Sequence, residues 1–264
     1  MDGFASIGFI GGGRVTRLLL TGWENAGKLP DNVMVSDPAE EVIGKLSSDF
    51  PTLTRTDNEG SAGCALVVLA VHPPVLADVL AEIRDVVTAD AVVLSLVPKA
   101  PIAKLQSALG TQNVVRMIPN AASAIGRGYN PKTTAKAVEP AVNAQLDAFF
   151  APWGACPEVE EKTLEAYAII SAMGPTYLWF QLQTLRELAH EFGLSAQAAD
   201  EAILATVKGA AECLLATGWT PDEVMDMIPV KPLAEHEETI KEAYRGKLSA
   251  LFKKLSPAGS SEKN

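Results

Sequence analysis

The stretch "SIGFIGGGRVTRLLL", residues 6–20, constrains the fold of this chain more than any other segment. Apolar residues run directly into Gly11, Gly12 and Gly13, and a helical pattern begins at Arg14. Glycine adopts positive φ without steric cost, so consecutive glycines permit a tight strand-to-helix turn. Backbone N–H groups at a helix start lack partners within the helix and attract anions. The segment therefore predicts a βα unit whose turn binds a phosphate group.

Strands and helices alternate through the first half of the chain. The expected strands are apolar runs at residues 5–10, 33–36, 65–71, 91–97 and 113–118. The segments between them place apolar residues at helical spacing. Strands that are apolar throughout are typical of a parallel sheet with helices on both faces. Residues 1–152 are therefore predicted to form an α/β domain of Rossmann type, with a doubly wound parallel sheet.

The second half has a different residue pattern, and no strand is expected after Trp153. Amphipathic stretches cover about residues 159–192, 195–217, 220–228 and 232–255. Residues 149–159 hold two prolines and a glycine and mark the junction. We therefore expect an all-α domain at 153–256. Residues 257–264 are small and polar and are expected to form a disordered tail.

The glycine turn reads G-x-G-x-x-T from Gly11 to Thr16, a variant of the dinucleotide-binding fingerprint. Asp37 ends the second expected strand, 26 residues after Gly11, where an acid accepts hydrogen bonds from the ribose hydroxyls. Its charge repels the 2'-phosphate of NADP, so the sequence favours NAD. Arg14 is compatible with either cofactor, and Asp37 is also a candidate helix N-cap. A glycine turn without a ligand is the alternative interpretation.

Charge and cysteine content argue against several other functions. The formal net charge is -10, from 32 acidic and 22 basic residues, which disfavours nucleic-acid and anionic-membrane partners. Cys64, Cys156 and Cys213 lie far apart, so their spacing predicts neither disulfides nor a metal site. The first strand starts near Ala5, and no apolar run approaches the roughly 18 residues of a membrane span. We therefore expect a cytoplasmic protein.

Four motifs link this sequence to a known family. "IGFIGGGRV" at 7–15, "LAVHPPVLADVL" at 69–80, "VVRMIPNAASAIGRG" at 114–128 and "SAMGPTY" at 171–177 are similar to motifs of the pyrroline-5-carboxylate reductases. This resemblance implies hydride transfer from a nicotinamide dinucleotide to a cyclic C=N bond. It also implies a homodimer or larger assembly, formed through the helical domain, which contributes to the substrate pocket.

The resemblance places the cofactor against the turns that follow three of the expected strands. The expected contacts are Gly11, Gly12, Gly13, Arg14, Val15 and Asp37, then Ala70, Val71, His72 and Pro73, then Met117, Pro119 and Asn120. Asn120 is expected near the nicotinamide ribose. His72 stands where the family commonly has lysine, and a lone histidine after a strand is more often structural than catalytic.

The substrate side departs from the family pattern. The family loop close to "SPGGTT" is replaced by "IPVKPLAE" at 228–235, which has neither the double glycine nor a hydroxyl. The candidate catalytic residues are Thr176 as proton donor, Ser171, and Lys231 as a charge for an acidic substrate. A solvated loop lysine is the alternative for Lys231. A plain helix break is the alternative for Gly174–Pro175.

The sequence therefore predicts an NAD(P)H-dependent reductase of a cyclic imine or related carbonyl compound, without a metal site. A protonated imine is already electrophilic, so few catalytic residues are needed beyond those that orient the reactants. The altered loop favours a changed substrate over pyrroline-5-carboxylate itself, although proline biosynthesis stays open. A non-catalytic dinucleotide sensor is a second alternative. A hydroxyacid dehydrogenase is a third alternative, but the expected helix at 159–192 lacks the inward-facing Lys and Asn pair at helical spacing that would support it.

Overall fold

The computed structural model describes residues 4–256, which form two compact units. The first comprises residues 4–173 with 252–256, and the second comprises residues 174–251. The domain limits expected from the sequence, 1–152 and 153–256, stay a prediction. The boundary between the compact units lies further along the chain, after Met173, because residues 153–173 pair and pack with the rest of the first unit. The expected tail lies outside the described residues.

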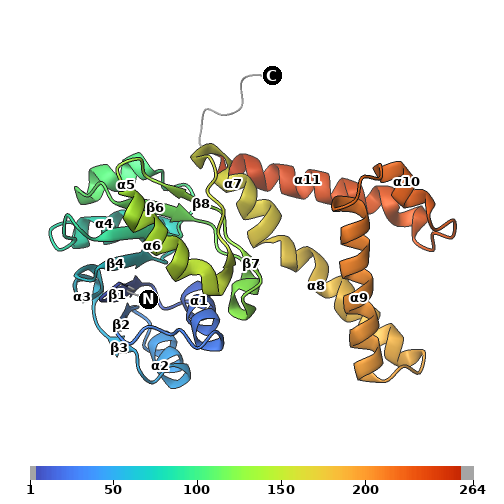
Figure 1. Cartoon of the computed structure of the whole chain (residues 1–264), viewed down its shortest axis with the longest axis horizontal. Coiled ribbons are helices and arrows are strands. Elements are labelled where there is room, and N and C mark those ends of the chain that lie inside the picture. The colour runs from blue at the N-terminus through green and yellow to red at the C-terminus, as the bar shows by residue number, and fades with distance from the viewer. Residues whose placement is uncertain (1–3, 257–264) are drawn as a thin grey trace. The chain divides into compact units, whose positions relative to one another are not determined.

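A seven-stranded sheet forms the centre of the first unit (Figure 1). Its strands in spatial order are β3 (Thr54–Arg55), β2 (Val33–Ser36), β1 (Ile7–Ile10), β4 (Leu66–Leu69), β5 (Val92–Ser95), β6 (Val114–Met117) and β8 (Lys132–Thr134). All neighbours pair in parallel except β8, which is antiparallel to β6. The predicted Rossmann-type sheet is confirmed, and β1, β2, β4, β5 and β6 lie within their expected ranges.

The short strands were not predicted from the sequence. Besides β3 and β8, a second sheet pairs β7 (Gly128–Tyr129) with β9 (Gly154–Ala155). The expectation that no strand follows Trp153 was therefore wrong. These strands have only two or three residues, too few for an alternating or continuous apolar pattern to appear in the sequence.

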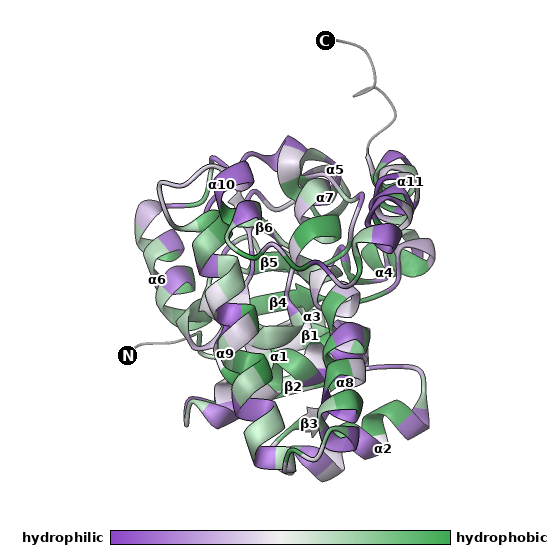
Figure 2. Ribbon diagram, turned by 90° about the vertical axis from the view of Figure 1, so that its right-hand side faces the viewer, coloured by the Kyte–Doolittle hydropathy of each residue, from purple (hydrophilic) through white to green (hydrophobic). Residues whose placement is uncertain are grey.

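Helices cover both faces of the sheet and form a separate core on each. One face carries α1 (Arg14–Asn25), α2 (Glu40–Asp49) and α6 (Pro140–Phe150), and the other α3 (Asn58–Ala62), α4 (Leu76–Ile83) and α5 (Ile102–Leu109). Val68 and Leu94 belong to the first core, whereas their chain neighbours Val67 and Val93 belong to the second. Both faces of these two strands are thus buried, which is why β4 is apolar throughout and β5 is apolar up to Ser95 (Figure 2).

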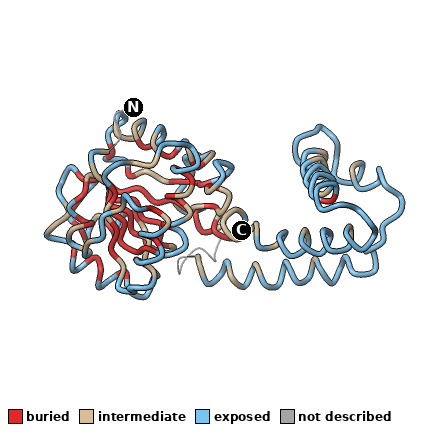
Figure 3. The backbone as a smooth tube through the Cα atoms, turned by 90° about the horizontal axis from the view of Figure 1, so that it is seen from below, coloured by how far each residue is buried: buried red, intermediate tan, exposed pale blue. Residues whose placement is uncertain are grey.

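The chain then becomes helical, as predicted. In the first unit α7 (Leu164–Tyr167) leads into a π-helical turn, η5 (Ala168–Ala172). The helices that follow are α8 (Gly174–Glu191), α9 (Ala196–Leu215), α10 (Pro221–Asp226) and α11 (Glu237–Leu255). Ala199 is the single buried residue among residues 174–251, and Figure 3 shows these helices as largely exposed. Within residues 4–256 no helix has the length and apolar content needed to cross a membrane.

Candidate functional site

The turn after β1 has the geometry that a phosphate-binding loop requires. Gly11 has a φ of +104°, and a Cβ there would come within 2.5 Å of the Ala70 carbonyl oxygen. The hydroxyl of Thr16, which replaces the third fingerprint glycine, donates to the Gly11 carbonyl at 2.5 Å and closes the turn. A Cβ on Gly13 would meet nothing within 4 Å, and no side chain caps the amino end of α1. The start of α1 is therefore open to an anion.

This turn lies at the topological switch point of the sheet. β1 pairs with β2 on one side and with β4 on the other, so the chain leaves the carboxyl end of β1 where the strand order reverses. Ligands of open α/β sheets bind at this point. Ala70 directly follows β4 and donates its N–H to the Ile10 carbonyl at 2.8 Å, which brings the turns after β1 and β4 together.

Asp37 faces the same turn. Its Oδ2 accepts the Gly12 N–H at 2.8 Å, and its Oδ1 accepts the Ala39 N–H at 2.9 Å. The N-cap residue of α2 is Ala39, so the alternative role of Asp37 as the N-cap itself was wrong. The carboxylate instead ties the end of β2 to the glycine turn. Sequence reasoning anticipated the position of this acid but not its bond to Gly12.

The turn after β4 presents His72 and Pro73 to solvent. The His72 carbonyl accepts the Val75 N–H at 3.2 Å, where a 3₁₀ turn over Pro73–Val75 leads into α4. Val71 is partly buried against the core below α4 and α5. The backbone of this turn, rather than an imidazole embedded in polar partners, is what lies next to Gly11.

The turn after β6 is held by buried amides. Asn120 is 8% exposed; its backbone N–H donates to Asn130 Oδ1 at 2.7 Å, and its own Oδ1 accepts the Ala122 N–H at 2.9 Å. Asn130 is fully buried and also accepts the Ser123 hydroxyl at 2.8 Å. Sequence reasoning missed Asn130, because an asparagine in a loop gives no sign of its partners. Met117 is buried at the end of β6.

Asn120 also reaches the helical segment that precedes the second unit. Its Nδ2 donates to the Ser171 carbonyl at 2.5 Å. The Ser171 hydroxyl donates to the Tyr167 carbonyl at 2.8 Å, so its proton stays within its own helix. The structure thus brings Ser171 to the turn after β6, but through its carbonyl rather than its hydroxyl.

Thr176 and Lys231, the other two predicted catalytic residues, belong to the second unit. Thr176 lines a shallow groove of about 260 Å³ between α8 and α11, together with Tyr177 and Tyr244. Burial, and secondarily the neighbouring Tyr244, raise the pKa of Tyr177. Lys231 is exposed in the loop after α10. The structure therefore assembles the predicted cofactor turns within the first unit and leaves these two residues in the other.

Lys99, after β5, was not anticipated from the sequence. It has a φ of +62° and is the only non-glycine residue with positive φ among residues 4–256. Its backbone N–H donates to Glu165 Oε1 at 3.3 Å, and Glu165 pairs with Arg116 of β6 at 2.8 Å, with both side chains 3% exposed. A glycine would have signalled this conformation, whereas a lysine does not.

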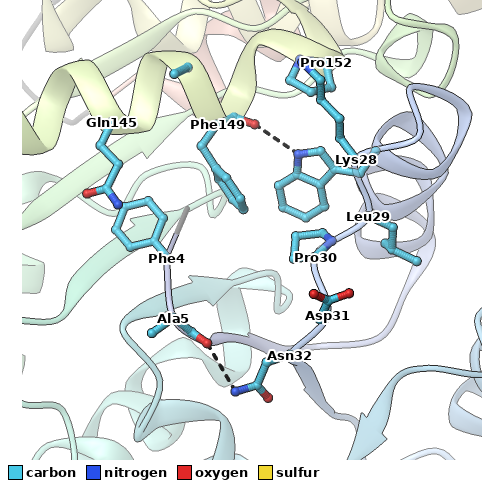
Figure 4. Close-up of a pocket in the computed structure, with 12 residues that line it drawn as sticks. Phe4, Ala5, Lys28, Leu29, Pro30, Asp31, Asn32, Gln145, Phe149 and Pro152 are labelled. Carbon is cyan, nitrogen blue, oxygen red and sulfur yellow. Dashed lines mark hydrogen bonds between the residues drawn. The ribbon is translucent and has the colours of Figure 1, made fainter. Parts of the chain in front are cut away.

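A cavity of about 410 Å³ lies elsewhere on the first unit (Figure 4). It is lined by Phe4, Phe149 and Pro30, and also by Lys28 and Asp31. Phe4 precedes β1, so this cavity lies at the amino ends of the strands. The glycine turn follows the carboxyl end of β1, at the opposite edge. The cavity is therefore separate from the candidate cofactor site.

Cysteine and metal chemistry find little support in residues 4–256. No group of three or more His, Cys, Asp or Glu side chains is arranged to hold a metal ion there. Burial raises the pKa of the Cys64 thiol, and burial also raises the pKa of Cys156 to about 11. Both thiols stay protonated at neutral pH and are poor nucleophiles.

Two family models match the chain. Residues 6–99 match the model described as NADP oxidoreductase, coenzyme F420-dependent, and residues 161–256 match the model for pyrroline-5-carboxylate reductase dimerisation. The first range contains the turns after β1 and β4, and the second contains η5 and the helices that follow.

Individual relatives match over most of the chain. A pyrroline-5-carboxylate reductase from Corynebacterium melassecola is 31% identical and covers 83% of both chains. One from Methanosarcina acetivorans is 30% identical and covers 84% of this chain and 83% of its own. A crystal structure of Plasmodium falciparum pyrroline carboxylate reductase with NADP bound has a TM-score of 0.80 at 24% identity, over 97% of this chain and 98% of that chain. The last comparison shows a shared fold.

Proposed function

The chain belongs to the pyrroline-5-carboxylate reductase family, and from that premise we propose that it reduces the C=N bond of a cyclic imine. It is an NAD(P)-dependent oxidoreductase that acts on the CH–NH group of donors. The observation that carries the proposal is the match to a reductase over 83% of the chain, which spans both the cofactor turns and the helical half.

The residues after β1 fit a nicotinamide dinucleotide. Gly13 leaves the space that a Cβ would fill, and the N–H groups at the uncapped start of α1 would hold the diphosphate, with Arg14 and Val15 beside them. The Asp37 carboxylate would accept hydrogen bonds from the adenine-ribose hydroxyls. Ala70 to Pro73 and Met117 to Asn120 would flank the nicotinamide half. When bound, the cofactor supplies the hydride.

NAD is the cofactor we propose to be preferred. The Asp37 carboxylate is fixed by the N–H groups of Gly12 and Ala39, so its charge stays beside the ribose position. A 2'-phosphate there would meet that charge. We expect Asp37→Ser to raise the affinity for NADPH and to lower that for NADH, by fluorescence titration. A wild-type preference for NADPH would refute this interpretation of Asp37.

The substrate-side roles rest on the family resemblance. Thr176 Oγ1 would hold a proton near the imine nitrogen, and the Lys231 ammonium would attract a substrate carboxylate as a point charge. Ser171 would contribute through its fixed backbone position, because its hydroxyl already donates to Tyr167. The dimerisation match supports self-association, and we propose a homodimer or larger assembly in the cytoplasm.

The test is reduced-nicotinamide absorbance with pyrroline-5-carboxylate, then with a panel of other cyclic imines and keto acids, using NADH and NADPH in parallel. Turnover of another imine with little activity on pyrroline-5-carboxylate supports a changed substrate, as the loop at 228–235 favours. Efficient turnover of pyrroline-5-carboxylate assigns the chain to proline biosynthesis instead. Dinucleotide binding without reduction of any substrate would refute the enzymatic proposal.

A further inference from the structure

The helical segment that runs through Ser171 contains a proline at a position where an α-helix uses a backbone donor. In an α-helix the carbonyl of residue 171 accepts the N–H of residue 175, and that residue is Pro175, which has none. The π-helical geometry begins just before, where the Met173 N–H donates to the Ala168 carbonyl at 3.1 Å, five residues back. The sequence therefore leaves the Ser171 carbonyl without its usual donor.

Asn120 supplies the missing donor from a distant part of the chain. Its Nδ2 lies 2.5 Å from the Ser171 carbonyl oxygen, across 51 positions in sequence. The orientation of the amide is fixed, since its Oδ1 accepts the Ala122 N–H. The residue is 8% exposed, and its backbone N–H is held by the buried Asn130. One Nδ2 hydrogen and one Oδ1 lone pair of the amide are therefore engaged by protein groups, which holds the side chain in one orientation.

We propose that Asn120 is a positioning residue, which ties the turn after β6 to the Ser171 carbonyl in place of the Pro175 N–H. The inference rests on the proposed reductase function, and it assigns this side chain a role other than the expected one beside the nicotinamide ribose. Thr176 follows Ser171 by five residues, so loosening Ser171 disturbs the substrate side of the site. The proposed contacts to the diphosphate and the adenine ribose come from the turns after β1 and β2, so we expect cofactor affinity to stay largely unchanged.

The test compares Asn120→Ala with Asn120→Ser, which keeps an acceptor for the Ala122 N–H but shortens the donor. Circular dichroism first shows which variants fold. For each of these we expect kcat/KM for the imine to fall about tenfold, because the Ser171 carbonyl is left as an unsatisfied acceptor. The dissociation constant for NADH should change less than twofold. Asn113→Ala is the matched control, because the Asn113 amide also donates to a backbone carbonyl, that of Ala89, at the far end of β6. Equal losses of NADH affinity and kcat/KM would identify a cofactor ligand and overturn the proposal.

Pro175→Ala gives the second arm, because it restores an N–H at the position from which the Ser171 carbonyl is normally bonded. In a protein that carries Pro175→Ala, adding Asn120→Ala should lower kcat/KM less than threefold. A double-mutant cycle measured by urea unfolding should show the same coupling between the two positions without an activity assay. Additive effects in both readouts would overturn the proposal. A wild-type chain that reduces no imine refutes the proposed function, whereas an active wild type with unaffected Asn120 variants refutes only this inference.

Discussion

Gly11 and Gly13 share one turn but are needed for different physical reasons. Gly11→Ala forces a Cβ into a +104° backbone and within 2.5 Å of the Ala70 carbonyl, so we expect it to destabilise the fold by more than about 1 kcal/mol. Gly13→Ala meets no atom within 4 Å and should unfold in urea like the wild type. Its methyl group would nevertheless occupy the open face, and NADH affinity should fall about tenfold. Unchanged NADH titration for Gly13→Ala would contradict the assignment of this turn.

Replacing Lys99 by glycine tests whether its backbone conformation lowers the stability of the protein. The contacts of the side chain do not predict the direction of this change. At a φ of +62° a lysine carries a steric cost that glycine lacks, so Lys99→Gly should stabilise the protein by roughly 0.5–1 kcal/mol in urea unfolding. The backbone bond to Glu165 is kept in the variant. Lys104→Gly, at an exposed position inside α5, is the control and should destabilise by about 1 kcal/mol. Destabilisation by both would show that the Lys99 side chain stabilises the fold.

At the scale of elements, β8 is anchored by a buried cation. Lys132 is 1% exposed and donates to Glu158 Oε2 at 2.7 Å and to Asn143 Oδ1 at 2.9 Å. Burial raises the pKa of Glu158, but the bonds from Lys132 and Thr134 together lower it by more, so it lies below its ordinary value. A carboxyl group with a depressed pKa stabilises the fold above its unfolded pKa, and this stability is lost as pH falls through the folded pKa.

Glu158→Gln should therefore be less stable than the wild type at pH 7, and the difference should shrink below about pH 4. Urea unfolding at pH 7 and at pH 3.5 measures it. Asp85→Asn, at an exposed carboxylate, should leave the pH profile unchanged. A constant gap between wild type and Glu158→Gln at both pH values would show that the bond to Lys132 does not depend on the charge of Glu158.

The elements that sequence predicted are those whose cause is local. β1, β4 and β5 are buried on both faces and consist mostly of apolar residues, and the glycine turn carries its conformational demand in its own residues. β8 was missed because its residues, KTT, are polar, and its lysine is buried against partners distant in sequence, among them Glu158, Asn143 and Asp147. The bond between Asn120 and Ser171 was missed because the need for it arises at Pro175. Such features depend on tertiary partners, which one sequence does not reveal.

At the scale of the whole molecule, the second unit exposes many apolar side chains to water. Its helices begin at clear signals, such as the Ser195 cap of α9 and the capping box of Thr220 with Glu223. Yet large apolar side chains on these helices face water: Trp179 is 56% exposed, Phe180 64%, Leu204 72% and Leu215 79%. Burying them between copies of the chain recovers about 25 cal/mol for each Å² removed from water. This agrees with the match of residues 161–256 to a dimerisation model.

Leu204→Glu tests whether this apolar surface drives assembly. Leu204 lies in the middle of α9, so a glutamate there should leave the isolated helix intact but place a charge where a second copy would pack. Burying an unpaired carboxylate costs about 3 kcal/mol or more, equivalent to an association constant at least roughly 100-fold weaker. Light scattering after size exclusion should give a dimer or larger mass for the wild type and a monomer for the variant. Gln197→Glu adds the same charge at an exposed polar position of α9 and should keep the wild-type mass. A variant that retains the wild-type mass across a dilution series would place Leu204 outside the interface.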